Sequence, residues 1–532
     1  MNSVREKVLE LGFDSKLQFY LSTLVIILVL AIPILIVHKW SHRRNLPPSP
    51  PSVPILGHLH LLGPKAHQSL AKLSEKYGPI MFLKLGTKST LVISSPEMAK
   101  EVFKKHDLAF SQRPRMTCTD LLVTNKEGFA FQSNTPSWRN LRKIFMLEML
   151  SPNRVQQAQK IRAQETAYML KAILRDVTEN PNTPIALNPK LSLLTTNFIS
   201  QMILSKRYFS HDRGEETAEA KEFKYVNAEM MQLLGSIFPA DCLPWLYWFD
   251  IGGLQKRTKT LYPRFQAILT TILSDRRRER LADGDAHVDK DLVDVLLTHE
   301  EKSGDGATLN ELNIRGVVWD AFAGGTDTQV AATEWAMAHL IQSPDLIHEL
   351  RSEIDAVVGT DQRLVADSDI ASLPLLQAVV KETFRLHPPT PLLLPHETHE
   401  PCKVAGFDVP AMTRLFVNVW AMGRDERVWE DPMVFNPKRF LEGELKSVDV
   451  TGQHFQLMPF GTGRRICPAV AIGMAGVHLF VASLVHAFDW SLPDGVVELD
   501  MSENVGMVTP MASPLRAVPS PRLPPHLYSV VS

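Results

Sequence analysis

One cysteine of the chain stands in a setting suited to ligand or nucleophile chemistry. Cys467 follows the loop 459–466, which holds two glycines and two arginines. We expect a helix to begin at Cys467, because Pro468 suits the first helical turn, where a missing N–H is no loss. The helix dipole and the free N–H groups at that end favour thiolate over thiol. Cys467 is therefore predicted to be a metal ligand or a nucleophile, although most lone cysteines are small core residues.

A second segment of chemical interest, residues 324–328, reads Gly-Gly-Thr-Asp-Thr. We expect it near the middle of one helix that begins with a capping box at Thr308 and ends at Ser343, roughly 34 residues or about 50 Å long. Each glycine within a helix costs about 1 kcal/mol relative to alanine. The two glycines permit either a close helix crossing or the approach of a flat or bulky group to the backbone, and we favour the approach.

A third candidate is the helix predicted from about Pro374 to Leu386, which carries Glu382 and Arg385 on one face. An isolated Glu-x-x-Arg pair is common, and it usually forms an exposed ion pair worth under about 1 kcal/mol. The pair alone therefore indicates no function.

The stretch 396–402 has the ligand-like spacing His-x-x-His-x-x-Cys. No second ligand pair stands at a spacing that would close a zinc site. We expect the stretch to run from a pocket wall, at His396, into a surface β-hairpin.

The elements that must position these groups are mostly helical. After residue 65 the pattern is helical, with short strand-like pieces at Ile80–Leu85 and Thr90–Ile93. Beyond the N-terminal region there is no Gly/Ser linker, low-complexity tract or repeat. The sequence therefore predicts one large domain over residues 57–532, mainly α with a smaller β region.

The N-terminal region predicts a membrane anchor. From Leu17 to Val37 a run of 21 residues carries no formal charge, which is long enough for a helix to cross a hydrocarbon core of about 30 Å. Basic residues without acidic neighbours follow, which places the C-terminal part in the cytosol. We expect a luminal tail and transmembrane helix over 1–38 and a stiff, basic and proline-rich hinge over 39–56. The alternative, a buried core helix, is disfavoured because nothing upstream could pack over it.

The charge balance argues against one class of partner. Fifty-seven basic side chains against 58 acidic ones give a formal charge of −1, so we expect no nucleic acid as a partner, which would need a basic stripe. The apolar share of 45% and the charged share of 22% are usual for a folded globular protein. Four scattered cysteines are too few for a disulfide scaffold, which indicates a reducing compartment.

The loop before Cys467 resembles the haem-binding loop of the cytochromes P450. Phe460, Arg465 and Cys467 stand at the spacing of that family, with Ala469 where the family usually has glycine. The resemblance implies the cytochrome P450 fold, haem b (iron protoporphyrin IX) as cofactor, and Cys467 as the ligand of its iron. A thiolate ligand pushes electron density onto haem iron and favours O–O cleavage.

The glycine-rich segment of the long helix resembles the oxygen-activating segment of the same family. Gly325 would open the helix for dioxygen, and Asp327 and Thr328 would supply an acid and a hydroxyl relay. Gln329 stands where the family usually has Thr or Ser. The resemblance implies a monooxygenase that inserts one oxygen atom from O2 into a lipophilic or aromatic small molecule.

Further family motifs occur in the expected order. Glu382, Arg385 and Arg439 match the family's buried Glu–Arg–Arg network. Arginine suits bidentate contact with a carboxylate. The residues that the resemblance implies for the haem propionates are Trp138, Arg142, Arg465 and, where many members have an arginine, His396.

The electron donor must be another protein, because no Gly-x-Gly-x-x-Gly fingerprint of a dinucleotide site lies in a strand–helix unit. The family resemblance implies a membrane-bound NADPH–cytochrome P450 reductase. Basic residues on the cysteine side, among them Lys143 and Arg464, could form its docking face or could be ordinary solvated charges. The anchor implies contact with membrane lipid and a place in the endoplasmic reticulum membrane, with the catalytic domain in the cytosol.

The substrate is indicated only by resemblance. The stretches 333–338, 384–391 and 500–504 resemble the plant p-coumaroyl ester 3'-hydroxylases and flavonoid 3'-hydroxylases, which act on phenolic rings. These stretches are largely scaffold, so they indicate ancestry better than substrate. A fatty-acid hydroxylase and an isomerase or dehydratase without O2 use stay open as alternatives. A non-enzymatic haem carrier would have no use for Asp327 and Thr328.

Overall fold

The computed structural model describes residues 22–23, 45–122, 127–149, 151–209, 218–284, 287–303 and 309–529. Its main sheet has four strands in the order β1-β2-β7-β4. They are β1 (Ile80–Leu85), β2 (Lys88–Ile93), β7 (Arg414–Val417) and β4 (His396–Glu397). The hairpin β1–β2 is antiparallel, and β2 pairs in parallel with β7. Both predicted strands are confirmed, the second being two residues longer at its start.

Two smaller sheets complete the β region. Strands β3 (Ile185–Ala186), β9 (Arg516–Pro521) and β8 (Phe488–Ser491) form one of them. The other is the antiparallel hairpin of β5 (Cys402–Val404) and β6 (Phe407–Val409). This hairpin follows β4, so the prediction that the stretch 396–402 runs into a β-hairpin is confirmed.

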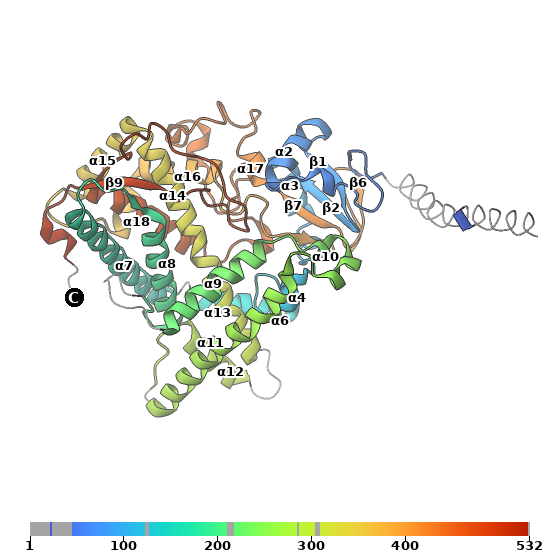
Figure 1. Cartoon of the computed structure of the whole chain (residues 1–532), viewed down its shortest axis with the longest axis horizontal. Helices are drawn as coiled ribbons and strands as arrows, with labels where there is room; N and C mark the ends of the chain where they lie inside the picture. The colour runs from blue at the N-terminus through green and yellow to red at the C-terminus, as the bar shows by residue number, and fades with distance from the viewer. Residues whose placement is uncertain are drawn as a thin grey trace, which may run out of the picture.

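Helices make up most of the body, and the main sheet lies at one end of it, beside α2 and α3 (Figure 1). The α-helices are α2 (Ala66–Tyr77), α3 (Pro96–Lys105), α4 (Thr117–Leu121), α6 (Pro136–Met149), α7 (Pro152–Glu179), α8 (Leu187–Leu204), α9 (Ala218–Gly235), α10 (Pro239–Cys242), α11 (Leu254–Asp283), α12 (Leu292–Ser303), α13 (Glu311–Gly325), α14 (Asp327–Ile341), α15 (Pro344–Val358), α16 (Pro374–Leu386), α17 (Val419–Met422) and α18 (Val470–Ala487). The helix predicted over 374–386 is confirmed as α16. The fold is mainly α with a smaller β region, as the sequence predicts.

The long central helix is divided into α13 and α14, so the prediction of one continuous helix is wrong. Thr326 stands between the two pieces with φ −95° and ψ −79°. Two glycines precede it, and glycine lowers the stability of helical backbone. The predicted cap at Thr308 lies outside the described residues. The observed capping box begins at Asn310, whose side chain accepts from the backbone N–H three residues on.

Two hydrophobic cores meet at this junction. The α14 core comprises buried side chains of α7, α14, α15, α16 and α18, including Trp335. The α13 core comprises buried side chains of α6, α9, α11, α12 and α13, including Trp319. Helix α8 contributes Leu191 to the first core and Phe198 to the second. The central helix is therefore interrupted where one core gives way to the other.

The predicted membrane span, residues 17–37, lies outside the described residues except for Ser22 and Thr23, which are helical. Within the described part, α18 is the one helix long and apolar enough to cross a membrane. Most of α18 is buried in the α14 core. Its apolar composition is therefore explained by packing inside the domain.

The proline-rich segment 47–54 packs against the body. The backbone N–H of Phe82 in β1 donates to the carbonyl of Pro48 at 3.0 Å. The ring of His58 donates to the carbonyl of Pro50 at 2.9 Å. The second half of the predicted hinge is thus fixed to the edge of the main sheet.

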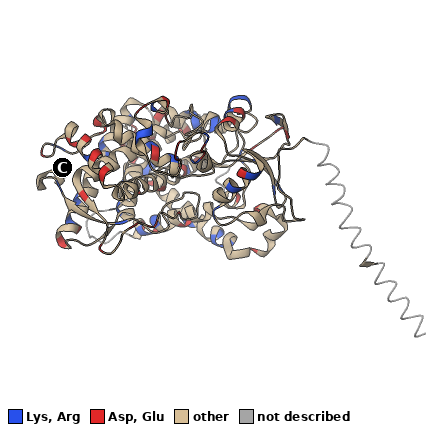
Figure 2. Ribbon diagram, turned by 90° about the horizontal axis from the view of Figure 1, so that it is seen from above, with Lys and Arg blue, Asp and Glu red and all other residues tan. Residues whose placement is uncertain are grey.

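Lys and Arg are interspersed with Asp and Glu over the described part of the chain (Figure 2). Many of them form ion pairs at the surface, such as Arg264 with Glu222 and Arg427 with Asp425. The pattern agrees with a formal charge of −1 spread over the whole body.

Candidate active site

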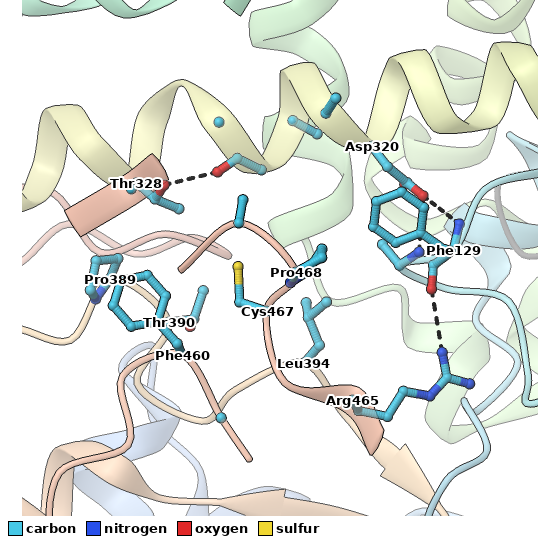
Figure 3. Close-up of a pocket in the computed structure, with 18 of the residues that line it drawn as sticks. Phe129, Asp320, Thr328, Pro389, Thr390, Leu394, Phe460, Arg465, Cys467 and Pro468 are labelled. Atoms are coloured by element: carbon cyan, nitrogen blue, oxygen red, sulfur yellow. Dashed lines mark hydrogen bonds between the residues drawn. The ribbon is translucent and has the colours of Figure 1, made fainter. Parts of the chain in front are cut away.

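A cavity of about 280 Å³ lies where α13 and α14 face the loop before α18. Figure 3 shows Cys467 on that loop with its sulfur directed towards the two helices, which carry Asp320 and Thr328. Most of the lining is aliphatic or aromatic. The polar, charged and indole side chains that line it are Arg113, Trp138, Arg142, Asp320, Thr328, Gln329, Thr390, His396, Thr462, Arg465 and Cys467.

The cysteine loop ends later than the sequence predicts. Helix α18 begins at Val470, so the predicted start at Cys467 is wrong. The backbone N–H of Cys467 instead donates to the carbonyl of Phe460 at 2.9 Å and closes the loop. Gly463 has φ +66°, and a Cβ there would lie 2.3 Å from a carboxylate oxygen of Asp107. Glycine is required at this turn for both reasons.

The Cys467 sulfur is placed to bind a cation. Burial raises the pKa of its thiol, while the backbone N–H of Ala469 and the guanidinium of Arg142 act in the opposite direction. A metal cation bound to the sulfur would offset the cost of burying its charge, because thiolate ligands are deprotonated on binding. The setting thus suits a metal ligand better than a free nucleophile.

Three arginines line the cavity beside the cysteine loop, namely Arg113, Arg142 and Arg465. None of them forms an ion pair with a carboxylate within the described part of the chain. They donate instead to backbone carbonyls: Arg465 to that of Ser111 at 2.8 Å, and Arg113 to that of Leu394 at 2.9 Å. Such a group of cations is suited to an anionic ligand.

The pKa values of these arginines also indicate a site for an anionic ligand. Burial, together with repulsion from Arg113 and Arg142, lowers the pKa of Arg465 to about 8. Burial likewise lowers the pKa of Arg113 to about 9, with Arg142 again contributing. Carboxylates placed among these guanidinium groups would relieve both the desolvation and the mutual repulsion.

Trp138 and His396 also line the cavity beside this group. The Trp138 indole N–H donates to the carbonyl of Phe129 at 2.8 Å, and its ring centroid lies 4.0 Å from the guanidinium carbon of Arg465. The His396 ring donates through Nδ1 to the carbonyl of Phe110 at 2.9 Å, and burial holds its pKa well below the usual value. Trp138 therefore acts through stacking on Arg465, since its N–H is already bonded to protein.

Arg113 is a member of this group that the sequence analysis did not identify. Its side chain is buried and touches the cavity. The stretch from Phe110 to Arg115 is mixed in polarity, so no sequence signal distinguishes this buried arginine from a solvated one.

The two glycines of α13 have different functions. A Cβ at Gly325 would lie 2.5 Å from the side chain of Ile199 in α8, whereas a Cβ at Gly324 would meet no atom within 4 Å. Both residues line the cavity. Both explanations offered by the sequence therefore apply, one to each glycine: Gly325 permits a close helix crossing, and Gly324 leaves space beside the backbone.

Thr328 lines the cavity, but Asp327 does not. The Thr328 hydroxyl donates to the carbonyl of Gly324 at 2.9 Å, across the junction between the two helices. Asp327 is largely withdrawn from solvent, and this burial raises the pKa of its carboxyl group. Gln329 packs against Gly476 of α18, where a Cβ would lie 1.9 Å from its amide oxygen.

Comparison with known proteins identifies the family. The sequence profile of the cytochrome P450 family matches residues 47–515. The chain belongs to the cytochrome P450 family. It is 39% identical to a flavonoid 3',5'-hydroxylase of Campanula medium, over 92% of this chain and 94% of that protein. It is 38% identical to a flavonoid 3'-monooxygenase of Petunia hybrida (91% and 93%) and 39% identical to a 3,9-dihydroxypterocarpan 6A-monooxygenase of Glycine max (92% and 96%).

Solved structures agree. A zebra fish cytochrome P450 with progesterone superimposes with a TM-score of 0.73 and 27% identity, covering 86% of this chain and 99% of that one. This P450 is accordingly a monooxygenase that uses O2, a lipophilic small molecule and the cofactor haem b.

The cavity of this P450 fits haem b on grounds of its own donor set. A cysteine sulfur faces it from one side, and space beside Gly324 is available on the other. Three arginines that pair with no carboxylate among the described residues match the two propionate groups that haem carries. The proximal loop, defined here as residues 459–469, and these arginines together satisfy the requirements of a flat dianionic metal complex.

A buried ion network lies behind the cavity of this P450. Arg385 donates to the two carboxylate oxygens of Glu382, each at 2.7 Å, and neither side chain is exposed. Arg439, from the 3-10 helix Pro437–Phe440, donates to the same carboxylate at 3.1 Å. The three residues named by the family motif therefore meet, and they join α16 to the segment that precedes the proximal loop.

Proposed function

We propose that this P450 hydroxylates the ring of a flavonoid or a closely related phenolic compound. The observation that carries the proposal is similarity over nearly the whole chain to two proteins named as flavonoid hydroxylases, at 38–39% identity. The cavity supports it, because Phe129, Phe131, Leu394 and Met507 line it and suit an aromatic substrate. A fatty-acid hydroxylase and an isomerase or dehydratase are the rival activities.

The residues of the proximal side would hold the cofactor. Cys467 would ligate the haem iron, and Phe460 would pack beside it. Arg113, Arg142 and Arg465 would bind the propionates, with His396 and Trp138 as neighbours. Thiolate-ligated haem activates dioxygen, because the thiolate donates electron density that favours O–O cleavage.

The residues of the distal side would manage protons. Thr328 would hold a proton at its hydroxyl oxygen, at the cavity wall, and Asp327 would supply protons from behind it. Burial raises the pKa of Asp327 and so favours its protonated form. Gly325 would keep α8 close and Gly324 would leave room for dioxygen. Glu382, Arg385 and Arg439 would fix the scaffold behind the proximal loop.

The cellular setting belongs to the same proposal. An uncharged run over residues 17–37 supports a single-pass anchor in the endoplasmic reticulum membrane, with residues 57–532 as the cytosolic domain. NADPH–cytochrome P450 reductase would then supply electrons from the same membrane. Arg464 is half-exposed beside the cysteine loop and Lys143 is exposed on α6, so both can meet a partner.

The test is a substrate panel with isotopically labelled dioxygen. Membranes containing the chain and the reductase receive NADPH and, in separate reactions, a flavanone, a p-coumaroyl ester and a medium-chain fatty acid. We expect label in the hydroxylated ring of the flavanone. Label only in the ester or the fatty acid, or product formation without O2, would assign one of the rival activities.

The proton role of Thr328 has a separate test. Thr328→Val keeps the volume and removes the hydroxyl, so NADPH oxidation should continue while product per NADPH falls severalfold. This is less than the roughly 10²–10⁴ in rate typical of a lost proton-transfer group, because water can substitute in part for the hydroxyl. Thr333→Val is the matched control, because Thr333 is a buried threonine of the same helix α14 and does not line the cavity. An unchanged ratio of product to NADPH in Thr328→Val would mean that Thr328 only packs at the cavity wall.

A further inference from the structure

Asp320 is a buried acid that none of the roles above uses. It is the only acidic residue among the described residues that line the cavity. Its side chain projects from α13 at some distance from Thr328 and Cys467, as Figure 3 shows. A buried carboxyl group is costly unless it is bonded, so its presence in an apolar wall requires a reason.

One oxygen of Asp320 is occupied by protein. Oδ2 accepts from the backbone N–H of Phe129 at 2.6 Å and from that of Ala130 at 2.9 Å. The contact is tight: a Cβ at Gly128 would lie 2.1 Å from this oxygen, and a Cβ at Gly316 would lie 2.3 Å from the Gly128 nitrogen. Asp320 therefore fixes the segment 127–131 against α13.

The other oxygen has no such partner. Within the described part of the chain, no hydrogen bond reaches Oδ1. The nearest cationic influence is Arg113, whose guanidinium is already bonded to the carbonyls of Ala130, Leu394 and Pro395. A carboxylate can accept about four hydrogen bonds, so acceptor capacity remains on the cavity side.

We propose that Oδ1 of Asp320 accepts a hydrogen bond from a hydroxyl group of the substrate, at the end opposite to the ring that is oxidised. This inference rests on the proposed function and narrows its substrate class. Asp320 lies in α13 and Thr328 lies eight residues on, in the first turn of α14. Ala321, Ala323 and Gly324 line the wall between them, and their small side chains leave room for a flat ring system along the helix.

The charge of this end selects among phenolic substrates. A flavonoid carries a neutral phenolic hydroxyl on the ring opposite to the one that is oxidised, and this hydroxyl can donate to Oδ1. An ester of p-coumaric acid with a hydroxy acid, or a fatty acid, would bring a carboxylate towards an acid, and like charges in a buried site repel. The distal wall of the cavity, defined here as the α13 residues 320–325 that line it, therefore favours a flavonoid with a free 7-hydroxyl.

The experiment compares two ligands that differ only in that group. Binding of 4',7-dihydroxyflavanone and of 4'-hydroxyflavanone to the haem-loaded chain is measured by spectral titration and by equilibrium dialysis. At pH 8, above the pKa of about 7 that burial gives Asp320, we expect the 7-hydroxyl to tighten binding about tenfold, as one hydrogen bond to a charged acceptor does. In Asp320→Asn the ratio should fall towards one, because the amide can keep an oxygen on the Phe129 and Ala130 N–H groups while it turns a donor to the cavity.

The controls separate the outcomes. Thr390→Val removes another polar group of the cavity wall, and its ratio should stay as in the unmodified chain. Equal weakening of both ligands in Asp320→Asn would mean that Asp320 only braces the segment 127–131, and the proposal would be withdrawn. If Asp320→Asn fails to fold, 4'-hydroxy-7-methoxyflavanone tests the unmodified chain, since it should bind no better than the ligand without the 7-hydroxyl.

The failure of the two proposals can be told apart. If neither flavanone binds the unmodified chain while a p-coumaroyl ester does, the flavonoid assignment is wrong and the Asp320 inference falls with it. If both flavanones bind with equal affinity, the flavonoid assignment stands and only the Asp320 inference is overturned.

Discussion

The proximal loop and the distal wall of the cavity are held in place by different means. On the proximal side, charged and hydrogen-bonded groups fix the backbone, as in the Glu382–Arg385 pair and the bond from Cys467 to Phe460. On the distal side, glycine contacts let segments touch, as between Gly316 and Gly128. The first kind of support depends on particular side chains at fixed spacing. The second kind of support depends on the position of a segment that is far away in the sequence.

The largest expected effect is on the proximal side. Cys467→Ala removes the sulfur, so the reduced carbon monoxide spectrum of thiolate-ligated haem should be lost entirely. Cys402→Ala, in the outlying strand β5, is the control and should leave the spectrum intact. A folded Cys467→Ala chain with the full spectrum would refute the ligand assignment.

The next effect tests the ion network. Glu382→Gln leaves Arg385 and Arg439 buried beside a neutral group, which should lower the free energy of unfolding by about 3–5 kcal/mol. Glu219→Gln breaks the exposed pair with Lys206 and should cost less than about 1 kcal/mol. Denaturant unfolding of both variants measures the difference. Equal losses would mean that the buried network contributes no more than a surface pair.

A smaller effect is expected at Arg113. Arg113→Gln removes one cation from the propionate group, so haem should transfer to apomyoglobin about tenfold faster, as for the loss of one charge-assisted hydrogen bond. Arg115→Gln is the matched control, because the Arg115 side chain is 79% exposed and pairs with Asp120. If both variants lose haem at the rate of the unmodified chain, Arg113 does not hold the cofactor.

The smallest effect concerns pH on the distal side. Burial raises the pKa of Asp320 to about 7, from about 4 in an unfolded chain. Between these values the folded chain holds a proton that the unfolded chain has released, so stability falls as pH rises, by at most about 1.4 kcal/mol per pH unit. Asp320→Asn should flatten this dependence. Thermal unfolding followed from about pH 5 to pH 7 measures it, and identical slopes would contradict the shift.

The contrast between the two sides explains what the sequence could predict. The proximal loop and α16 could be predicted because their residues are close in sequence and their chemistry requires fixed spacing. The start of α18 was misplaced because the N–H of Cys467 bonds to Phe460, a tertiary contact that helix propensity does not include. The split at Thr326 was missed because it depends on where the two cores meet.

The distal wall could be predicted much less. In the sequence, Asp320 cannot be distinguished from the other polar residues of its helix. Its hydrogen-bond partners come from the segment 127–131, which is far away in the sequence. Arg113 precedes the third member of its own group by more than 350 residues, at Arg465. Such long-range pairings need coordinates, since no local spacing encodes them.

Gly324 and Gly325 differ in the free space around them, and this difference decides which position can be substituted in an engineered enzyme. A side chain at residue 325 would require the Ile199 side chain to move, because its Cβ would lie 2.5 Å from the end of that side chain. Residue 324 is the adjustable one: an added methyl group would project into open space at the cavity wall. Alanine and serine at that single position would therefore change the shape offered to substrates while leaving the crossing of α8 and α13 as it is.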